Sequence, residues 1–257
     1  MDNQSFINPN HVPEEFKVPY DVIDLPSQGI LYPNKKSSVK VEYITANDEN
    51  ILASPNIIAN NHGLDILLKR KVKDLGFDVD NLLEGDRIAI LIYLRSTAFG
   101  PDYTQLVISN DEVVEGIVDL SKLNYKKLTV NPDEMGEFDY ELPSSKIKVK
   151  FRLLNGKDEK EISDIDEKIK PQNDGISSIE TLRLERCLME VDGERDKLKM
   201  SWSLKNNTIK LMDVRALKKY ITEIEPGIDT KTQARIHGGD SVDCFLKIGR
   251  SFWFPEI

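Results

Sequence analysis

A short pattern of residues occurs twice in this chain, in the same order and at almost the same spacing. Each copy has a Leu-Pro-Ser turn, then a strand of alternating apolar residues, then two acidic residues of the kind that begin a helix. The two copies are Leu25-Pro26-Ser27, Val39-Lys40-Val41 and Asp48-Glu49, and Leu142-Pro143-Ser144, Val149-Lys150-Phe151 and Asp158-Glu159. In the second copy the strand and the acidic pair both lie 110 residues further along. This order predicts two related halves.

The later part of each half adds a second correspondence. In both, a buried helix ends at a Pro/Gly pair and is followed by a predicted β-hairpin. These helices are expected at 86–99 and 209–224, and the hairpin strands at 103–108 with 113–118 and at 230–236 with 242–248. Other helices are expected at 64–75, 157–170, 177–191 and 196–204, and other strands at 39–44 and 147–154. The two hairpin turns are about 128 residues apart, so the second half should contain an insertion.

These elements predict an α+β fold in three parts. Residues 1–24 are polar and contain three prolines, so they are predicted to form an extended N-terminal arm. Residues 25–141 and 142–257 are predicted to be the first and second α+β halves, each with a strand, several helices and a terminal hairpin. Phe16 and Tyr20 are candidate anchors of the arm. The arm either packs on a partner subunit or is a frayed terminus.

The composition narrows the class of protein. The 257 residues are 39% hydrophobic and 31% charged, with a net charge of −9, which is typical of a soluble globular protein. The acidic balance argues against binding to duplex nucleic acid, which usually needs a basic face, and against anionic membranes. The longest apolar run, Ile88 to Leu94, is far shorter than the roughly 20 residues of a membrane helix. The first residues lack the pattern of a signal peptide.

Residues that usually carry chemistry are few and scattered. Cys187 and Cys244 are expected to be small core residues of a protein made in a reducing compartment, the cytosol. The three histidines have no partners at metal-ligand spacing, and the sequence holds no phosphate loop, dinucleotide-binding glycine pattern or nucleophile elbow. We therefore expect no catalytic residue, no cofactor and no metal. The acidic residues of the helix at 157–170 are expected to form a solvated face; they are Asp158, Glu159, Asp164 and Asp166.

The aromatic end of the chain, Phe252-Trp253-Phe254, would bury a large apolar area. It packs either against the chain's own core or against a neighbouring subunit.

The order of several motifs resembles the baseplate hub proteins of contractile-tailed, T-even-like bacteriophages. The resemblance spans roughly residues 22–257. Its pieces are Leu25-Pro26-Ser27-Gln28-Gly29-Ile30-Leu31-Tyr32-Pro33, Asp119-Leu120-Ser121, Glu141-Leu142-Pro143-Ser144, Glu190-Val191-Asp192-Gly193, Asp213-Val214-Arg215-Ala216-Leu217-Lys218-Lys219-Tyr220, Pro226-Gly227-Ile228-Asp229 and Phe252-Trp253-Phe254-Pro255.

The resemblance implies hairpins like those of zinc ribbons, because members of that family often carry a Cys-x-x-Cys pair at each hairpin tip. Here the tips are Ser109-Asn110-Asp111-Glu112 and Arg235-Ile236-His237-Gly238. Neither supplies the thiolates of a structural zinc site, so we expect ordinary turns without zinc.

The resemblance also implies a function. It predicts a non-enzymatic virion protein of the tail baseplate, or a factor that assembles its hub, made in the host cytoplasm and acting on other baseplate or tail proteins. No membrane and no small-molecule substrate is expected. Arg215 is expected to make a fork-like contact to a carboxylate, within the fold or across an interface. The candidate interaction residues are Phe16, Tyr20, Tyr32, Arg215, Tyr220, Phe252, Trp253 and Phe254.

Two alternatives belong to other classes. Ribbon-like hairpins often bind nucleic acid, so a nucleic-acid-associated binding module is one, although the acidic balance argues against it. The other is a hydrolase of cell walls that uses a carboxylate pair, supported only by the many scattered acidic residues.

Overall fold

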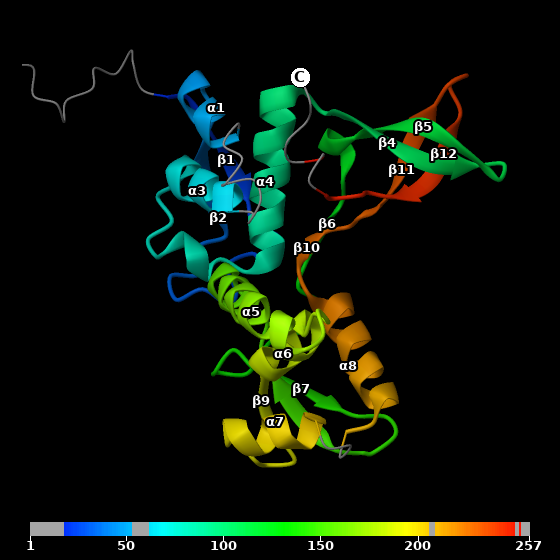
Figure 1. Ribbon diagram of the computed structural model, residues 1–257. Coiled ribbons are helices and arrows are strands. Elements are labelled where there is room, and N and C mark those ends of the chain that lie inside the picture. Colours follow the sequence, from blue (N-terminus) through cyan, green and yellow to red (C-terminus); the bar gives the residue numbers. More distant parts are fainter. Residues whose placement is uncertain (1–17, 53–61, 206–208, 250–251, 253–257) are drawn as a thin grey trace, which may run out of the picture.

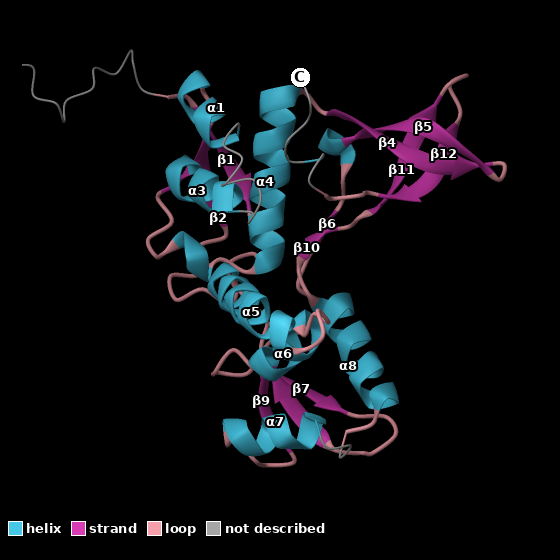
Figure 2. Ribbon diagram, in the orientation of Figure 1, coloured by secondary structure: helices cyan, strands magenta, loops and turns pink. Residues whose placement is uncertain are grey.

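The computed structural model describes residues 18–52, 62–205, 209–249 and 252 (Figure 1). These residues form a mixed α+β fold with several small antiparallel sheets (Figure 2). The helices longer than one turn are α1 Ala46–Leu52, α3 His62–Lys71, α4 Glu84–Phe99, α5 Gly156–Ile169, α6 Ile179–Cys187, α7 Lys197–Lys205 and α8 Leu211–Ile224. None of the described helices is both long and apolar enough to cross a membrane.

The first sheet joins β1 Tyr20–Asp24, β2 Ser38–Glu42 and β3 Val72–Lys73, in that order and antiparallel. Alternation along β1 and β2 places Ile23, Val39 and Val41 in the core. Helices α1 and α3 lie between β2 and β3 in the chain, and α4 stands beside the sheet (Figure 1). Strand β1 lies within the predicted arm, so residues 20–24 of that arm belong to the folded part.

The second sheet has the same plan. Strands β7 Phe138–Glu141, β8 Lys148–Phe151 and β9 Leu188–Val191 pair antiparallel in that order, with α5 and α6 between β8 and β9. Phe138 and Phe151 face each other at this sheet's core, with ring centroids 5.5 Å apart. Because β7 pairs with β8, the residues 138–141 that the sequence placed in the first half belong to the second sheet.

Two predicted helices are shorter than their periodicity indicated. The stretch 177–191 is helical only to Cys187, and the remainder is β9. The stretch 64–75 is helical only to Lys71, and Val72–Lys73 is β3. In both cases apolar residues that continued the helical pattern pair with a neighbouring strand: Val72 with Val41 on β2, and Leu188 and Val191 with Phe151 and Val149 on β8. Tertiary pairing therefore overrides the local period.

The two predicted hairpins are confirmed and share one sheet. Strands β4 Asp102–Ser109 and β5 Glu112–Asp119 form the first, and β11 Lys231–Ile236 and β12 Ser241–Phe245 form the second. They join through β5 and β11, giving the order β12-β11-β5-β4. The side-chain amide of Gln105 on β4 contacts the carbonyl of Phe245 (3.0 Å) and the amide of Lys247 (2.9 Å), so the outer strands curl toward each other.

A close backbone contact connects the two parts of the chain. Strand β10 Gly227–Ile228 pairs with β6 Tyr125–Lys126 and passes the start of α4. A Cβ atom on Gly85 would lie 1.7 Å from the carbonyl oxygen of Pro226. Only glycine therefore permits this approach, and the chain after α8 is held directly against α4.

Candidate interaction site

Both Leu-Pro-Ser turns are held by an aspartate from a distant helix. The backbone N–H of Ser27 donates to Asp86 on α4 at 2.9 Å, and the Ser27 hydroxyl donates to the same carboxylate. The backbone N–H groups of Ser144 and Ser145 donate to Asp213 on α8, at 2.7 and 3.1 Å. Asp86 and Asp213 are both the third residue of their helices. Each carboxylate therefore ties a turn to a helix.

The pKa values of the two aspartates are shifted in opposite directions. Burial raises the pKa of Asp86, although Ser27 and Tyr32 both donate hydrogen bonds to it. Burial acts in the same direction on Asp213, but donors from Ser144 and Ser145 outweigh it and lower the pKa of that carboxyl. Both carboxylates are fully buried and hydrogen-bonded, so their role is to hold the fold.

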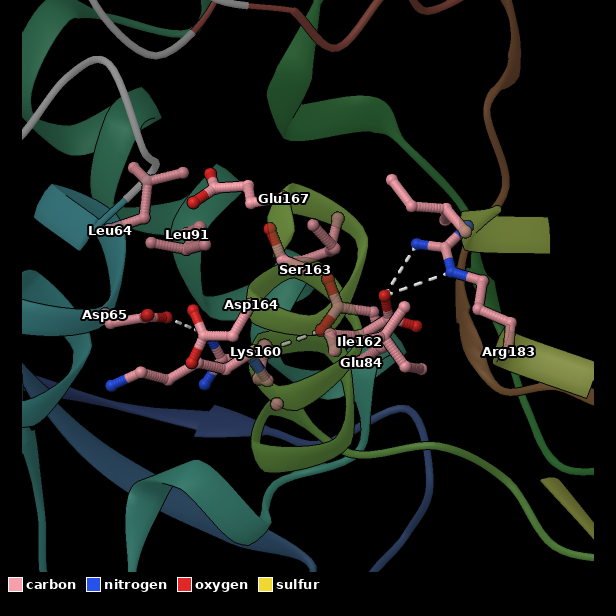
Figure 3. Close-up of a pocket in the computed structure, with 15 residues that line it drawn as sticks. Leu64, Asp65, Glu84, Leu91, Lys160, Ile162, Ser163, Asp164, Glu167 and Arg183 are labelled. Carbon is pink, nitrogen blue, oxygen red and sulfur yellow. Dashed lines mark hydrogen bonds and ion pairs between the residues drawn. The ribbon is translucent and has the colours of Figure 1, made fainter. Parts of the chain in front are cut away.

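A polar cavity of about 330 Å³ lies between α3, α4 and α5 (Figure 3). Its walls combine apolar residues such as Leu64 and Leu91 with charged groups that contact one another. Buried Arg87 donates from Nη2 to Asp65, and its Nε lies 3.2 Å from the carboxylate of Glu84. A Cβ on Gly156 would lie 2.4 Å from the guanidinium of Arg87. The contacts of this arginine therefore define the cavity wall.

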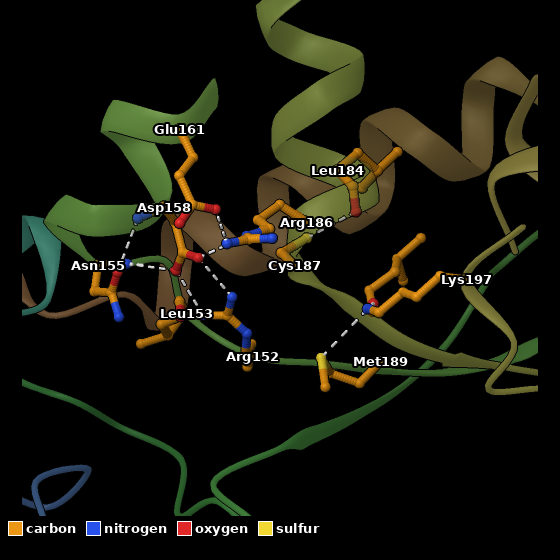
Figure 4. Close-up of polar contacts among 11 residues, drawn as sticks. Arg152, Leu153, Asn155, Asp158, Glu161, Leu184, Arg186, Cys187, Met189 and Lys197 are labelled. Carbon is orange, nitrogen blue, oxygen red and sulfur yellow. Dashed lines mark hydrogen bonds and ion pairs between the residues drawn. The ribbon is translucent and has the colours of Figure 1, made fainter. Parts of the chain in front are cut away.

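Acidic residues at the starts of α1 and α5 form a second matching pair. Asp48 accepts the backbone N–H of Thr45 (2.8 Å) and pairs with Lys71 (2.5 Å) and Arg70 (3.4 Å). Asp158 accepts the backbone N–H of Asn155 at 3.1 Å (Figure 4).

Asp158 also pairs with two arginines, Arg152 at 2.6 Å and Arg186 at 2.7 Å (Figure 4). Burial alone would raise the pKa of Asp158, but hydrogen bonds from the two arginines overcome it and lower the pKa to about 2. The carboxylate is thus ionised at neutral pH and locks α5 to α6 and β8.

These contacts correct the expectation of a solvated acidic face on α5. Asp158 and Asp166 are buried, and Asp166 accepts hydrogen bonds from Ser177 and Ser178. Glu159 pairs with Arg183, and only Asp164 is exposed as expected. The sequence shows the charge of these residues but not the basic and hydroxyl partners that the fold brings to them.

The cysteines do not form a reactive site. Cys187 is buried, and burial raises the pKa of its thiol to about 12. Cys244 is half-buried, and burial raises its pKa as well. Across the part of the chain that the structure describes, no group of three or more His, Cys, Asp or Glu side chains is placed to hold a metal ion.

Two of the candidate interaction residues lie in the core. Tyr32 is buried; its hydroxyl donates to Asp86 and accepts the N–H of Leu83 at 2.9 Å. Phe252 is fully buried and packs on Tyr103 with ring centroids 4.8 Å apart. For Phe252 the chain's own core is therefore the packing partner, and Tyr32 is a core residue instead of a surface contact.

The remaining candidates that the structure describes lie at or near the surface. Tyr20 is half exposed on β1, with Lys40 5.1 Å from its ring centroid. Tyr220 stacks on Tyr140 with centroids 4.5 Å apart. Arg215 is exposed and makes no hydrogen bond or ion pair to another described residue, so no carboxylate contact within the described part of the fold is formed, and a contact across an interface stays a prediction. Phe16, Trp253 and Phe254 lie outside the described residues.

The most prominent exposed apolar residues are ones that sequence reasoning missed. Several of them occur at the β4–β5 hairpin and around the junction of α7 and α8, namely Leu106, Ile108, Val113, Leu198, Trp202, Leu211 and Met212, and others of similar exposure, such as Met135, Ile176 and Phe245, lie elsewhere. In both places the sequence contains a pattern that could have predicted exposed apolar residues. The hairpin strands carry apolar residues on both faces, and α7 has apolar residues without a single stripe. Such patterns leave apolar side chains exposed in the part of the chain that the structure describes.

Comparisons with protein-family models, with curated proteins and with solved structures found no match to this chain.

Proposed function

We propose that this chain is a non-enzymatic structural or assembly protein of a contractile-tail baseplate hub, acting through protein–protein contacts. The observation that carries the contact role is the outward placement of large apolar side chains at two separate places on the fold. Solvent-exposed groups of this kind mark interaction sites in soluble proteins. The assignment to a phage baseplate is supported by the order of the sequence motifs that resemble that family.

We further infer that the chain consists of two related halves. The two three-stranded sheets have the same strand order, with helices in the same place between the second and third strands. Matching hydrogen bonds support the inference: the pair Asp86 and Asp213, the pair Asp48 and Asp158, and the bonds from Leu25 to Ser37 and from Leu142 to Ile147.

Helix α7 is the insertion in the second half. Between β3 and α4 the first half has only a short 3-10 turn, Val79–Asn81, whereas α7 occupies the corresponding stretch between β9 and α8. The hairpins would be zinc-ribbon-like elements without the metal, because their turns carry no cysteine. Metal analysis of the purified protein tests this, and one equivalent of zinc or more would contradict it.

The charge of the β4–β5 hairpin does not favour the nucleic-acid alternative. Residues 102–119 contain five acidic and no basic residues, so this hairpin would repel a phosphate backbone.

Mass spectrometry of intact phage particles from the source tests the proposed role. A few copies of the chain per particle would establish a baseplate component. Absence from particles together with abundance in infected-cell lysate would leave the assembly factor. Absence from both particles and assembly intermediates would contradict the proposal.

A further inference from the structure

The β4–β5 hairpin ends in an apolar, acidic surface. Ile108 pairs directly with Val113 across the hairpin, and Leu106 lies two residues before Ile108 on the same face. Their exposed fractions are 71%, 67% and 54%. Asp111, Glu112 and Glu115 surround them. We call these six residues the hairpin tip.

The junction of α7 and α8 is an apolar, basic surface. Leu198 and Trp202 are four residues apart on α7, so they share one face of the helix, and they are 82% and 63% exposed. Together with Lys199 they line a shallow groove, which Glu194 and Ser203 complete. Lys199 pairs with Glu194 at 2.6 Å.

The start of α8 extends this surface. The N–H of Ile209 donates to the carbonyl of Ser203 on α7 at 3.4 Å, which brings the two helices together. Leu211 and Met212 follow and are 65% and 66% exposed, beside exposed Lys210. We call Leu198, Lys199, Trp202, Lys210, Leu211 and Met212 the helical corner.

The two surfaces carry opposite charge. Residues 102–119 hold five acidic and no basic residues, whereas residues 195–219 hold eight basic and two acidic ones. Four of these eight basic residues, Arg195, Lys199, Lys218 and Lys219, pair with acidic side chains. Exposed Lys210 and Arg215 have no ion pair to a described residue, so they give the corner its basic character in a chain whose net charge is −9. Both surfaces have an apolar centre, and the charged residues around the two centres are of opposite sign. The surfaces are therefore complementary in apolar area and in charge, the two properties that select a partner surface.

The two surfaces cannot meet within one molecule. The β4–β5 hairpin projects from one end of the fold, and α7 lies at the opposite end (Figure 1). A contact between them therefore requires two copies of the chain.

We propose that the hairpin tip of one copy binds the helical corner of a second copy. The contact is heterologous, because different surfaces of the two molecules meet, and each bound copy keeps one free tip and one free corner. Repetition produces a closed ring or an open chain, depending on the rotation between neighbours. This inference does not depend on the proposed baseplate role.

The proposed contact uses the six residues of the hairpin tip and the six of the helical corner, which is fewer than the roughly 20–30 residues on each side of a standard interface. We therefore expect a dissociation constant on the order of 100 μM. Sedimentation of the full chain from about 1 to 500 μM should show an average mass that rises with concentration beyond that of a dimer. Raising the salt from about 0.05 to 0.5 M should weaken association, because exposed charges are then screened.

Two double variants separate the two surfaces. Ile108→Ser with Val113→Ser alters only the tip, and Leu198→Ser with Trp202→Ala alters only the corner. Each variant alone should associate at least tenfold more weakly than the natural chain. Because all four side chains are exposed, the fold should be retained, which circular dichroism checks. Met135→Ser, which removes an apolar side chain of 71% exposure elsewhere, is the matched control and should not change association.

Mixing the two double variants is the decisive experiment. One variant keeps a working corner and the other a working tip, so an equimolar mixture should form dimers and nothing larger. If either double variant fails to fold, the charge reversals Lys199→Glu with Lys210→Glu and Glu112→Lys with Glu115→Lys replace the two. Each of these alone should associate weakly, because its tip and corner then carry the same sign of charge, and their mixture should assemble beyond dimers, because the reversed tip and the reversed corner are again complementary. A natural chain that stays monomeric throughout, a mixture of folded variants that stays monomeric, or an equal loss in Met135→Ser would each overturn the proposal. Binding to anionic vesicles by a chain that never self-associates would overturn it as well.

Discussion

Asp86 and Asp213 stand at the third position of α4 and α8, and each accepts a backbone hydrogen bond from the serine of a Leu-Pro-Ser turn. Asp86 has a further donor, the hydroxyl of Tyr32. The same hydrogen bond between a turn and a helix thus occurs in both parts of the chain. In the first part, the buried hydroxyl of Tyr32 adds another hydrogen bond to the aspartate.

Replacing Asp86 by alanine should destabilise the protein by about 2–4 kcal/mol, because buried donors of Ser27 and Tyr32 would lose their acceptor. Urea unfolding followed by circular dichroism measures the change. Asp139→Ala is the control: Asp139 is exposed and pairs with Lys150 at 3.2 Å, so its loss should change the free energy by less than about 0.5 kcal/mol. Equal effects of the two substitutions would show that the buried network does not stabilise the fold.

Asp158 should make stability depend on pH in the acidic range. Its pKa is lowered to about 2 in the folded chain, below the value of about 3.9 in an unfolded chain. An acid with a depressed pKa stabilises the fold above its unfolded pKa, and this stabilisation is lost as the pH falls through the folded pKa. The shift corresponds to about 2–3 kcal/mol.

The free-energy difference between the natural chain and Asp158→Asn should therefore be largest above about pH 4 and shrink toward pH 2. Unfolding measurements from about pH 6 to pH 3 follow this change. Asp164→Asn on the exposed side of the same helix should show no such trend. A difference for Asp158→Asn that is constant across this range would contradict the ion pairs with Arg152 and Arg186.

A methyl group at Gly85 should disrupt the contact between α4 and the chain after α8. The new Cβ would meet the backbone oxygen of Pro226 at 1.7 Å, which no side-chain rotation relieves. We expect Gly85→Ala to cost about 3 kcal/mol or more, although alanine is intrinsically better in a helix by about 1 kcal/mol. Gly249→Ala, where a Cβ meets no atom within 4 Å, should be nearly neutral. Thermal unfolding compares the two variants.

The two cysteines should react with thiol reagents at different rates. Cys187 is buried with a pKa raised to about 12, whereas Cys244 is half-buried. At about pH 8, a maleimide should modify Cys244 first and Cys187 only after denaturant is added. Peptide mapping distinguishes the sites, with Cys244→Ser as the control that should leave the native chain almost unlabelled. Rapid labelling of Cys187 in the native chain would contradict its burial.

Local sequence patterns were sufficient to predict the helices and hairpins whose formation depends on residues close together in the chain. The β4–β5 hairpin was predictable because two alternating strands flank a turn in which Asn110 and Asp111 adopt positive φ values of 50° and 65°, a conformation that these residues tolerate. Helix α4 was predictable from its length, its apolar residues and the stop at Gly100. The order of elements in the two parts was predictable for the same reason.

Partners that are distant in the chain were not predictable. Leu188–Val191 looked helical and became β9 because β8 offers it hydrogen bonds. Asp158 and Asp166 looked solvated and are buried because arginine and serine groups come to them from other elements. The candidate interaction residues were predicted least accurately. Tyr32 and Phe252, which were predicted to make contacts, are core residues, whereas Ile108 and Trp202, which were not predicted, are exposed.

The sequence by itself determined the repeated order of turn, strand and helix, the places of the two hairpins and the charge of each segment, because these depend on residues close together in the chain. Only the tertiary structure decided which apolar faces are covered, that the hairpins join through Val118 and Ala234, and that an acidic and a basic apolar surface lie at opposite ends. The physical reason is that burial is a property of two surfaces that meet, and a single segment contains only one of them.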